Sequence, residues 1–213
     1  RVITDDRSLS AKLAQLWVTK TQSYAFWRFD FLKLVMKKGP RKILYTEIID
    51  CNLDFGFDTT MSATISIWLK TTNLSQRGGI LGKVGLSNWE WTLSQGIDSS
   101  DIFFWYWKVD SNVNLSISVS NFFESNVWKK VDLVWSHTSN TLTFYRNGIG
   151  ITSSTPASSS FQNRASNISI GYTYNVFNNN YWAGQMGSVH LYQRALSAKE
   201  IAQNFNATRD RYG

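Results

Sequence analysis

The stretch from Gly184 to Ala207 constrains the fold most strongly, because its apolar pattern changes from that of a strand to that of a helix. In its first half, Val189 and Leu191 stand among small or polar residues, as in a strand with one buried face. In its second half, Ser197 and Glu200 have the spacing of a capping box, which predicts the first turn of a helix. The sequence therefore predicts a strand that leads into a short helix near the end of the chain.

Short runs of β-branched and aromatic residues, separated by Ser, Thr, Asn and Gly, recur from residue 43 onward. Ten Trp and only two Pro in 213 residues favour β-sheet over a helical bundle or a disordered chain. Asn147-Gly148 predicts a two-residue hairpin turn, and the Ser-rich residues 152–160 predict a surface connector. The predicted strands are residues 43–50, 63–70, 79–84, 89–94, 101–109, 113–119, 127–137, 141–146, 167–173 and 182–192.

The first 42 residues differ in charge from the rest, so we divide the chain into a basic segment, 1–42, and one domain, 43–213. The basic segment holds ten Lys/Arg and three Asp, whereas the domain holds twelve charges of each sign. Within the segment, residues 8–18 have the pattern of a short helix and residues 24–35 that of a strand. This uneven distribution of charge indicates that the basic segment docks on an acidic partner, such as other subunits of an assembly. Nucleic acid is the less favoured partner, and a merely solvated basic face is the alternative.

Several motifs of the domain occur in a familiar order: IDC at residues 49–51, ATISIWLKTTNLSQRGGILGK, VWKKVDLVWS, LTFYRNG, ISIGY and GQMGSVHLYQRALSAKEI. As an ordered set over roughly residues 45–205, they resemble the laminin-G-like, concanavalin A-like jelly-roll domain. The resemblance implies an all-β sandwich of two antiparallel sheets with a short C-terminal helix. It also implies that Trp68, Trp128 and Ile201 are core residues. Residues 24–30 are similar to the family's first strand, and residues 204–213 resemble the ends of such domains in phage virion proteins.

The sequence offers few residues that are arranged for catalysis. A glycoside hydrolase on this fold needs two carboxylates that face the scissile bond. The nearest candidates, Glu47 and Asp50, are three residues apart and would point to opposite faces of a strand. The two histidines, His137 and His190, belong to no metalloprotease motif. We therefore predict that the chain is not an enzyme, with a laminarinase-like glycoside hydrolase as the alternative.

Calcium is the one cofactor that the resemblance implies, since several jelly-roll relatives bind it. Asp50, Asp54 and Asp58 are weak candidate ligands, because their spacing of four matches no calcium-loop signature. Ser188 occupies a position in the closing strand where relatives often carry an acidic residue. We therefore predict no cofactor, with calcium as the alternative.

Aromatic residues among asparagines predict a glycan-binding loop, because sugar rings pack on aromatic faces and amides bind hydroxyls. The run YTYNVFNNNYW supplies the candidate residues Tyr174, Phe177, Asn178, Asn180, Tyr181 and Trp182. A second candidate is FFWYWK, residues 103–108, where Phe103, Trp105 and Trp107 share one face of a strand. One face of that strand must be core. The other is either a sugar platform or covered by the N-terminal segment, and we favour the cover.

Together these patterns predict a non-enzymatic carbohydrate-binding, adhesion or structural module of a virion or an extracellular surface, oligomeric and bound to glycans. A purely architectural subunit without glycan binding is a further alternative. No run of 18 apolar residues occurs, so no membrane span is predicted. Cys51 is the single cysteine, which excludes a disulfide within the chain and favours assembly in a reducing cytoplasm.

Overall fold

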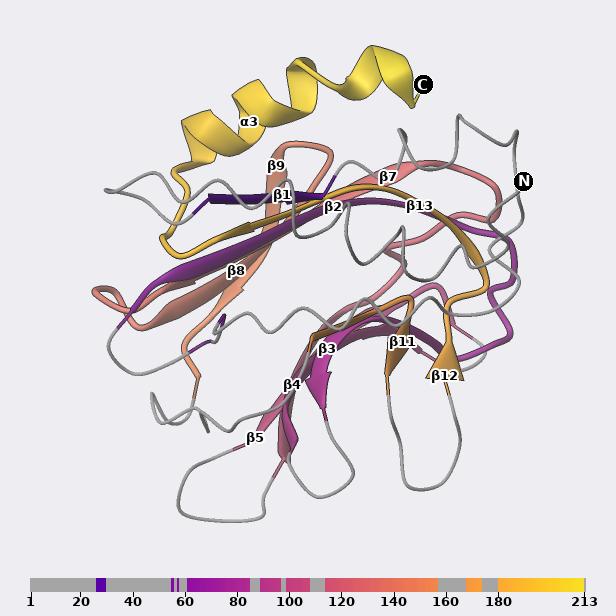
Figure 1. The fold of residues 1–213 in the computed structure, drawn as a ribbon, viewed down its shortest axis with the longest axis horizontal. Helices are drawn as coiled ribbons and strands as arrows, with labels where there is room; N and C mark the ends of the chain where they lie inside the picture. Colours follow the sequence, from indigo (N-terminus) through magenta and orange to yellow (C-terminus); the bar gives the residue numbers. More distant parts are fainter. Residues whose placement is uncertain are drawn as a thin grey trace, which may run out of the picture.

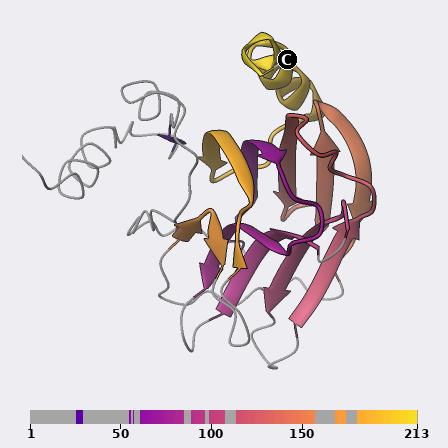
Figure 2. The same ribbon diagram turned by 90° about the vertical axis from the view of Figure 1, so that its right-hand side faces the viewer.

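In a computed structural model, the chain folds into two antiparallel sheets that face each other, with a short helix on the outside of one of them (Figure 1). The structure describes residues 55, 57, 61–84, 89–96, 99–107, 114–156, 168–173 and 180–212, and the backbone of residues 26–29. In the view turned by 90°, the C-terminal helix lies above the six-stranded sheet, and the five-stranded sheet lies below it (Figure 2). This arrangement confirms the predicted all-β, jelly-roll type of sandwich with a C-terminal helix.

The sheets contain these strands, given in spatial order. The six-stranded sheet consists of β1 (Phe26–Phe29), β13 (Gly184–Tyr192), β2 (Ala63–Thr71), β7 (Lys129–Ser136), β8 (Thr141–Arg146) and β9 (Ile149–Ser154). The five-stranded sheet consists of β10 (Ile168–Ile170), β3 (Gly78–Val84), β4 (Trp89–Gln95), β5 (Ile102–Trp107) and β6 (Asn114–Val119). A two-stranded hairpin is formed by β11 (Tyr172–Thr173) and β12 (Asn180–Tyr181), and the chain continues into α3 (Ala198–Asn206) and the 3-10 helix η1 (Arg209–Arg211).

Most predicted strands are confirmed to within a few residues, and the differences have local causes. The predicted strand 167–173 is interrupted at Gly171, whose φ of 76° turns the chain out of β10. The predicted connector at 152–160 begins too early, because residues up to Ser154 pair with β8 as the edge strand β9. Asn147 and Gly148 both have positive φ (53° and 82°), as the predicted hairpin turn requires. The predicted helix 8–18 and strand 43–50 lie outside the described residues.

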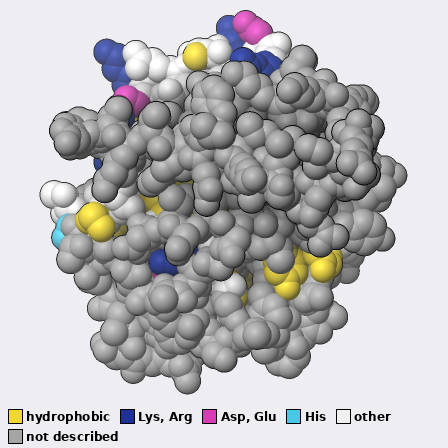
Figure 3. Space-filling model, viewed as in Figure 1, with side chains coloured by type: hydrophobic (Ala, Val, Ile, Leu, Met, Phe, Trp, Pro, Cys, Tyr) yellow, Lys and Arg dark blue, Asp and Glu magenta, His cyan; other side chains and the backbone are white. Residues whose placement is uncertain are grey.

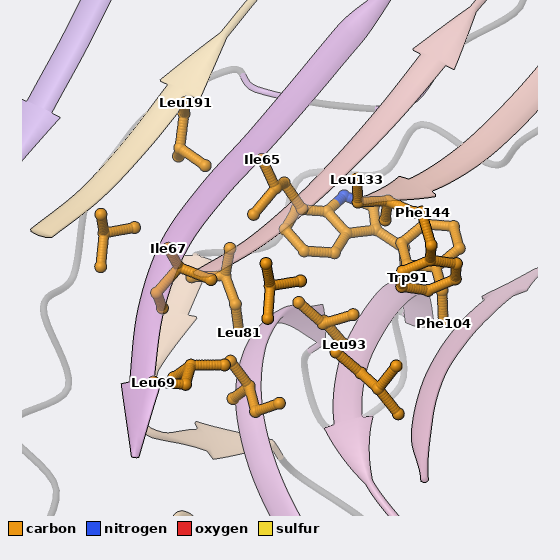
Figure 4. Packing of buried hydrophobic residues seen from close by; sticks show 14 of the residues in the cluster. Ile65, Ile67, Leu69, Leu81, Trp91, Leu93, Phe104, Leu133, Phe144 and Leu191 are labelled. Carbon is orange, nitrogen blue, oxygen red and sulfur yellow. The ribbon is translucent and has the colours of Figure 1, made fainter. Parts of the chain in front are cut away.

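The core lies between the two sheets and is filled by alternate residues of facing strands. Ile65, Ile67 and Leu69 of β2 point inward and are fully buried (Figure 4). Leu93 and Trp91 of β4 approach them from the other sheet. Full burial of one such aliphatic side chain stabilises the folded state by about 1.5–3 kcal/mol, so this layer is the main source of stability.

The outer face of the six-stranded sheet, which is the face turned away from the other sheet, is covered by the C-terminal segment. The ring of Trp68 stacks with those of Phe205 and Tyr212, with centroids 5.7 and 4.5 Å apart. Trp68 Nε1–H also donates a hydrogen bond to Thr208 Oγ1 at 3.1 Å. In Figure 3, charged side chains lie along the top of the molecule over this segment, whose exposed charged residues are Lys199, Arg209, Asp210 and Arg211.

The residues implied to be core by the family resemblance lie in this second layer. Trp68 and Ile201 are buried, as expected, but they pack between the sheet and the C-terminal segment and not between the sheets. Trp128 is only half-buried, so the expectation that it is a core residue is wrong. Its ring lies at the end of the sheet against Tyr212, with Lys70 Nζ 5.3 Å from its centroid.

A buried polar cluster lies within the same outer face. Lys130 and Asp132 of β7 form an ion pair with 2.5 Å between Nζ and Oδ1, and Lys130 Nζ donates to Ser66 Oγ at 2.9 Å. Their side chains are only 3% and 0% exposed. Burial raises the pKa of the Asp132 carboxyl above its ordinary value, while the Lys130 ammonium opposes that change. Each of these two buried charges is therefore compensated by the other.

The capping box of α3 predicts an acid-sensitive contribution to stability. Arg194 Nη2 donates to Glu200 Oε1 at 2.7 Å, and the Ser197 amide donates to Oε2 at 2.8 Å, which together lower the pKa of Glu200 to about 2. In the unfolded chain this carboxyl titrates near 4.5. Its stabilising effect is therefore fully present above about pH 4.5 and is lost as the pH falls toward 2.

We expect Glu200→Gln to be less stable than the wild type by about 0.5–1 kcal/mol near pH 7, and the gap to close between about pH 4.5 and 2. Urea unfolding of both proteins across this pH range measures the gap. A gap that stays constant down to pH 2 would show that the charge of Glu200 does not contribute.

None of the helices in the described part of the chain is long and apolar enough to span a membrane.

Candidate carbohydrate-binding site

The hairpin β11–β12 stands beside β3 and is held there by backbone hydrogen bonds (Figure 1). The Gly171 amide donates to the Ile80 carbonyl at 2.8 Å, and the Trp182 amide donates to the Gly171 carbonyl at 2.9 Å. Ser169 Oγ donates to the carbonyl of Tyr172 at 2.7 Å. The start of the hairpin is therefore fixed to β3, and its end is fixed to its start.

The hairpin lies on the outer face of the five-stranded sheet. A Cβ atom built on Gly82 of β3 would lie 3.2 Å from Thr173 Cγ2 and 3.1 Å from Thr92 Oγ1. Thr92 belongs to the outer face, because its neighbours Trp91 and Leu93 point into the core. The absence of a side chain at Gly82 thus leaves the space in which Thr173 packs.

Two tyrosines form a pair of rings at this hairpin. Tyr172 and Tyr181 are paired across β11–β12, and their ring centroids lie 5.1 Å apart at an angle of 33°. Tyr181 is 38% exposed, which makes it one of the few large apolar side chains on the surface of the described residues. We call Tyr172 and Tyr181 the hairpin ring pair. Tyr181 was predicted from the sequence, whereas its partner Tyr172 was not selected, because strand pairing across an Asn-rich loop leaves no local signal.

Trp182 does not belong to an exposed site, which corrects the prediction from the sequence. Its side chain is 7% exposed and is part of the core between the sheets. The ring centroid lies 5.6 Å from that of Phe123, and the ring fits against Gly78, where a Cβ would be 3.0 Å away. The indole Nε1–H donates to the carbonyl of Gln185 at 3.3 Å. The ring therefore has no free face on which a sugar could stack.

The other candidate residues of this loop stay predictions. Tyr174, Phe177 and Asn178 lie outside the described residues, as does the side chain of Asn180.

A second pair of rings lies on the outer face of β5. Phe103 and Trp105 are half-buried, with ring centroids 5.9 Å apart at 21°, whereas Phe104 and Tyr106 point into the core. We call Phe103 and Trp105 the sheet ring pair. A Cβ on Gly96 would lie 2.7 Å from the Phe103 ring, so this glycine leaves room for the ring to lie over the backbone.

Comparison with known proteins identifies the fold family. The sequence profile of the concanavalin A-like lectin/glucanases superfamily matches residues 50–202. The chain belongs to this superfamily. The matched residues fall inside the predicted domain 43–213, while the boundary at residue 42 stays a prediction. A search of curated proteins found no match.

Solved structures with a similar fold include carbohydrate-binding and toxin domains. The CBM40 domain of Ruminococcus gnavus IT-sialidase, bound to α2,3-sialyllactose, is 17% identical, with 68% of this chain and 83% of that chain covered and a TM-score of 0.57. The binding domain of Paraclostridial Mosquitocidal Protein 1 is 20% identical over 75% of this chain and 40% of that one, with a TM-score of 0.57. The binding domain of botulinum neurotoxin serotype G is 15% identical over 71% and 37%, with a TM-score of 0.54. At these identities, the likeness shows the fold alone.

The described carboxylates of this superfamily member have structural partners. Glu90 pairs with Lys83 at 3.0 Å, and Glu124 pairs with Lys129 at 2.5 Å. Asp101 Oδ1 accepts a hydrogen bond from the Asn121 amide at 2.9 Å. Asp132 and Glu200 are bound as described above, and Asp210 lies on the exposed C-terminal segment. The candidates Glu47 and Asp50 lie outside the described residues.

The metal prediction is not tested by the described residues. The candidate ligands Asp50, Asp54 and Asp58 all lie outside them. Among the residues that are described, no three His, Cys, Asp or Glu side chains are grouped as metal ligands. Ser188 in the closing strand is buried, and its amide donates to the hydroxyl of Tyr212 at 3.0 Å.

Proposed function

We propose that this chain is a non-catalytic carbohydrate-binding module that uses the hairpin ring pair as its contact with sugar. The observation that carries the proposal is the exposed ring of Tyr181, backed by Tyr172 on a hairpin that is fixed to the sheet. A sugar packs the C–H groups of its ring against such an aromatic face, and a ring that is already held in place loses little conformational entropy on binding.

Two further observations support this function. The chain belongs to a superfamily that contains lectins, and the similar CBM40 structure was solved with a bound sialyllactose. The described carboxylates are engaged in ion pairs or backbone contacts, which supports binding over hydrolysis.

The setting that we propose is a virion or another extracellular surface, with the basic segment 1–42 attached to neighbouring subunits. The resemblance of residues 204–213 to the ends of phage virion domains and the charge of the basic segment support it. Several copies in one assembly would convert weak binding at each site into strong attachment, because the second contact forms at a high effective concentration.

The first test is a glycan array probed with the wild-type protein coupled to a multivalent support. We expect binding to a subset of glycans, and Tyr181→Ala to weaken it about tenfold because the stacking surface is removed. Tyr181→Phe should retain binding, since it keeps the ring and removes only the hydroxyl.

Ile149→Ala serves as the matched control, because Ile149 is also an exposed apolar residue but lies on β9 of the other sheet. It should bind like the wild type. If the multivalent wild type binds no glycan at all, the proposed function is wrong and an architectural role is favoured.

A further inference from the structure

The hairpin that carries one ring pair lies on the same face of the five-stranded sheet as the sheet ring pair. Thr173 of the hairpin packs over Gly82 of β3, and Trp105 is paired with Thr92, which is itself paired with Gly82. These residues therefore form one row across the outer face of the five-stranded sheet. β4 lies between β3 and β5, so two strand spacings, about 10 Å, separate the hairpin's position on the sheet from the sheet ring pair.

The sheet ring pair is bordered by hydroxyl groups. On one side, Phe103 and Trp105 are paired with Ser94 and Thr92 of β4, which are buried; on the other side, they are paired with Ser118 and Ser116 of β6. Both serines of β6 are exposed, whereas Ile117 between them packs toward the core. Rings next to exposed hydroxyls offer a sugar both a stacking surface and hydrogen-bonding groups.

The described strands of this face carry no exposed charged side chain. Its outward side chains are aromatic or hydroxyl-bearing, apart from glycines. Asp101, two residues before Phe103, is a described carboxylate beside this face, and the ion pair of Lys83 and Glu90 is buried, with 3.0 Å between Nζ and Oε1. An anionic sugar such as a sialic acid would bury its carboxylate here without a described cation, which is unfavourable. An uncharged sugar has no such cost.

We propose that the ligand is an uncharged oligosaccharide chain that contacts the hairpin ring pair and the sheet ring pair at the same time. This inference rests on the proposed glycan-binding function and specifies its ligand. The position of the hairpin on the sheet lies more than one sugar ring from the sheet ring pair, so a chain of several units is needed to contact both ring pairs. The hydroxyls of Ser116 and Ser118 then lie beside the sugar on the sheet ring pair.

The first experiment measures affinity against chain length by calorimetry. The probes are neutral glucose and N-acetylglucosamine oligomers of one to six units, with sialyllactose as the anionic counterpart. For the wild type, we expect affinity to rise about tenfold or more as the oligomer becomes long enough to reach the second ring pair. Trp105→Ala should remove this rise with chain length, whereas Tyr181→Ala should weaken binding at every length.

The second experiment tests charge at Ser116, which is exposed, so that substitution leaves the core intact. Ser116→Arg and Ser116→Glu both crowd the ring of Trp105. With an uncharged ligand, both should weaken the binding of long oligomers by similar factors, within about twofold of each other, and independently of salt. With an anionic ligand, Arg would strengthen binding and Glu would weaken it.

The matched control is the same pair of substitutions at Ser125, an exposed turn residue outside this face. Neither should change affinity. Circular dichroism and urea midpoints of all variants confirm that they are folded.

The outcomes separate the two proposals. If oligomers bind but affinity does not depend on chain length or on Trp105, the extended site is wrong and the hairpin site stands. If sialyllactose binds more tightly than every neutral oligomer, or Ser116→Arg strengthens binding, the uncharged ligand is wrong. If no probe binds even to the multivalent protein, the glycan-binding function itself is wrong.

Discussion

Asp132→Ala is expected to lower the free energy of unfolding by about 3–5 kcal/mol, which is one of the largest effects that a single substitution in this chain can have. Asp132 is fully buried, and its carboxylate compensates the ammonium of Lys130 at 2.5 Å. Without it, Lys130 keeps only the hydroxyl of Ser66 as a described partner, and a charge buried in that way is strongly destabilising. Urea unfolding at neutral pH measures the loss.

Two controls distinguish this effect from a general loss of a carboxylate. Asp210→Ala removes the same group from an exposed pair, with 3.7 Å to Arg209, and should change stability by no more than about 0.5 kcal/mol. The double variant Lys130→Met with Asp132→Leu removes both charges and should recover most of the stability, because no buried charge is left uncompensated. An Asp132→Ala variant as stable as Asp210→Ala would contradict the assignment of a buried ion pair.

Gly184→Ala is expected to destabilise the protein by about 3 kcal/mol, because β13 and β2 come too close at this point for any side chain. A Cβ on Gly184 would lie 2.1 Å from the carbonyl oxygen of Lys70 and 2.9 Å from the Cα of Thr71. Both are backbone atoms of the neighbouring strand, so they can give way only if the pairing of Gly184 with Thr71 is disturbed. Thermal and urea unfolding measure the effect.

Gly150→Ala is the matched control for this substitution. Its Cβ would meet the ring of Tyr145 at 3.5 Å, which is ordinary van der Waals contact, on the exposed edge strand β9. It should leave stability unchanged to within about 0.5 kcal/mol. Equal stability of the two variants would show that the close approach at Gly184 can relax without cost.

Local patterns predicted the elements of this fold correctly where neighbours in the chain decide the conformation. Ser197 and Glu200 form the predicted capping box, and Asn147-Gly148 forms the predicted turn. The positions of most strands follow from alternating apolar residues. These signals succeed because each depends on residues only a few positions apart.

The candidate site was only partly predictable, because exposure depends on packing between distant segments. Tyr181 and Trp182 are adjacent in an aromatic run, yet one is exposed and the other fills the core beside Gly78. Tyr172 becomes a candidate only through its pairing with Tyr181 across a loop. For Phe103 and Trp105, alternation predicted that they share a face of their strand. It did not decide whether that face belongs to the core or lies on the outside of the sheet.

The sequence by itself determined that the chain is rich in strands and that its last strand leads into a capped helix at Ser197, while the jelly-roll sandwich was what the family resemblance implied. Capping, turn geometry and alternation are local, so they can be inferred without the rest of the chain. Only the tertiary structure decided which aromatic rings are core, which hold the C-terminal segment and which face outward. Trp68 shows the reason: a strand presents two faces, and a residue on the outer one is buried when a distant segment, here with Phe205 and Tyr212, packs against it.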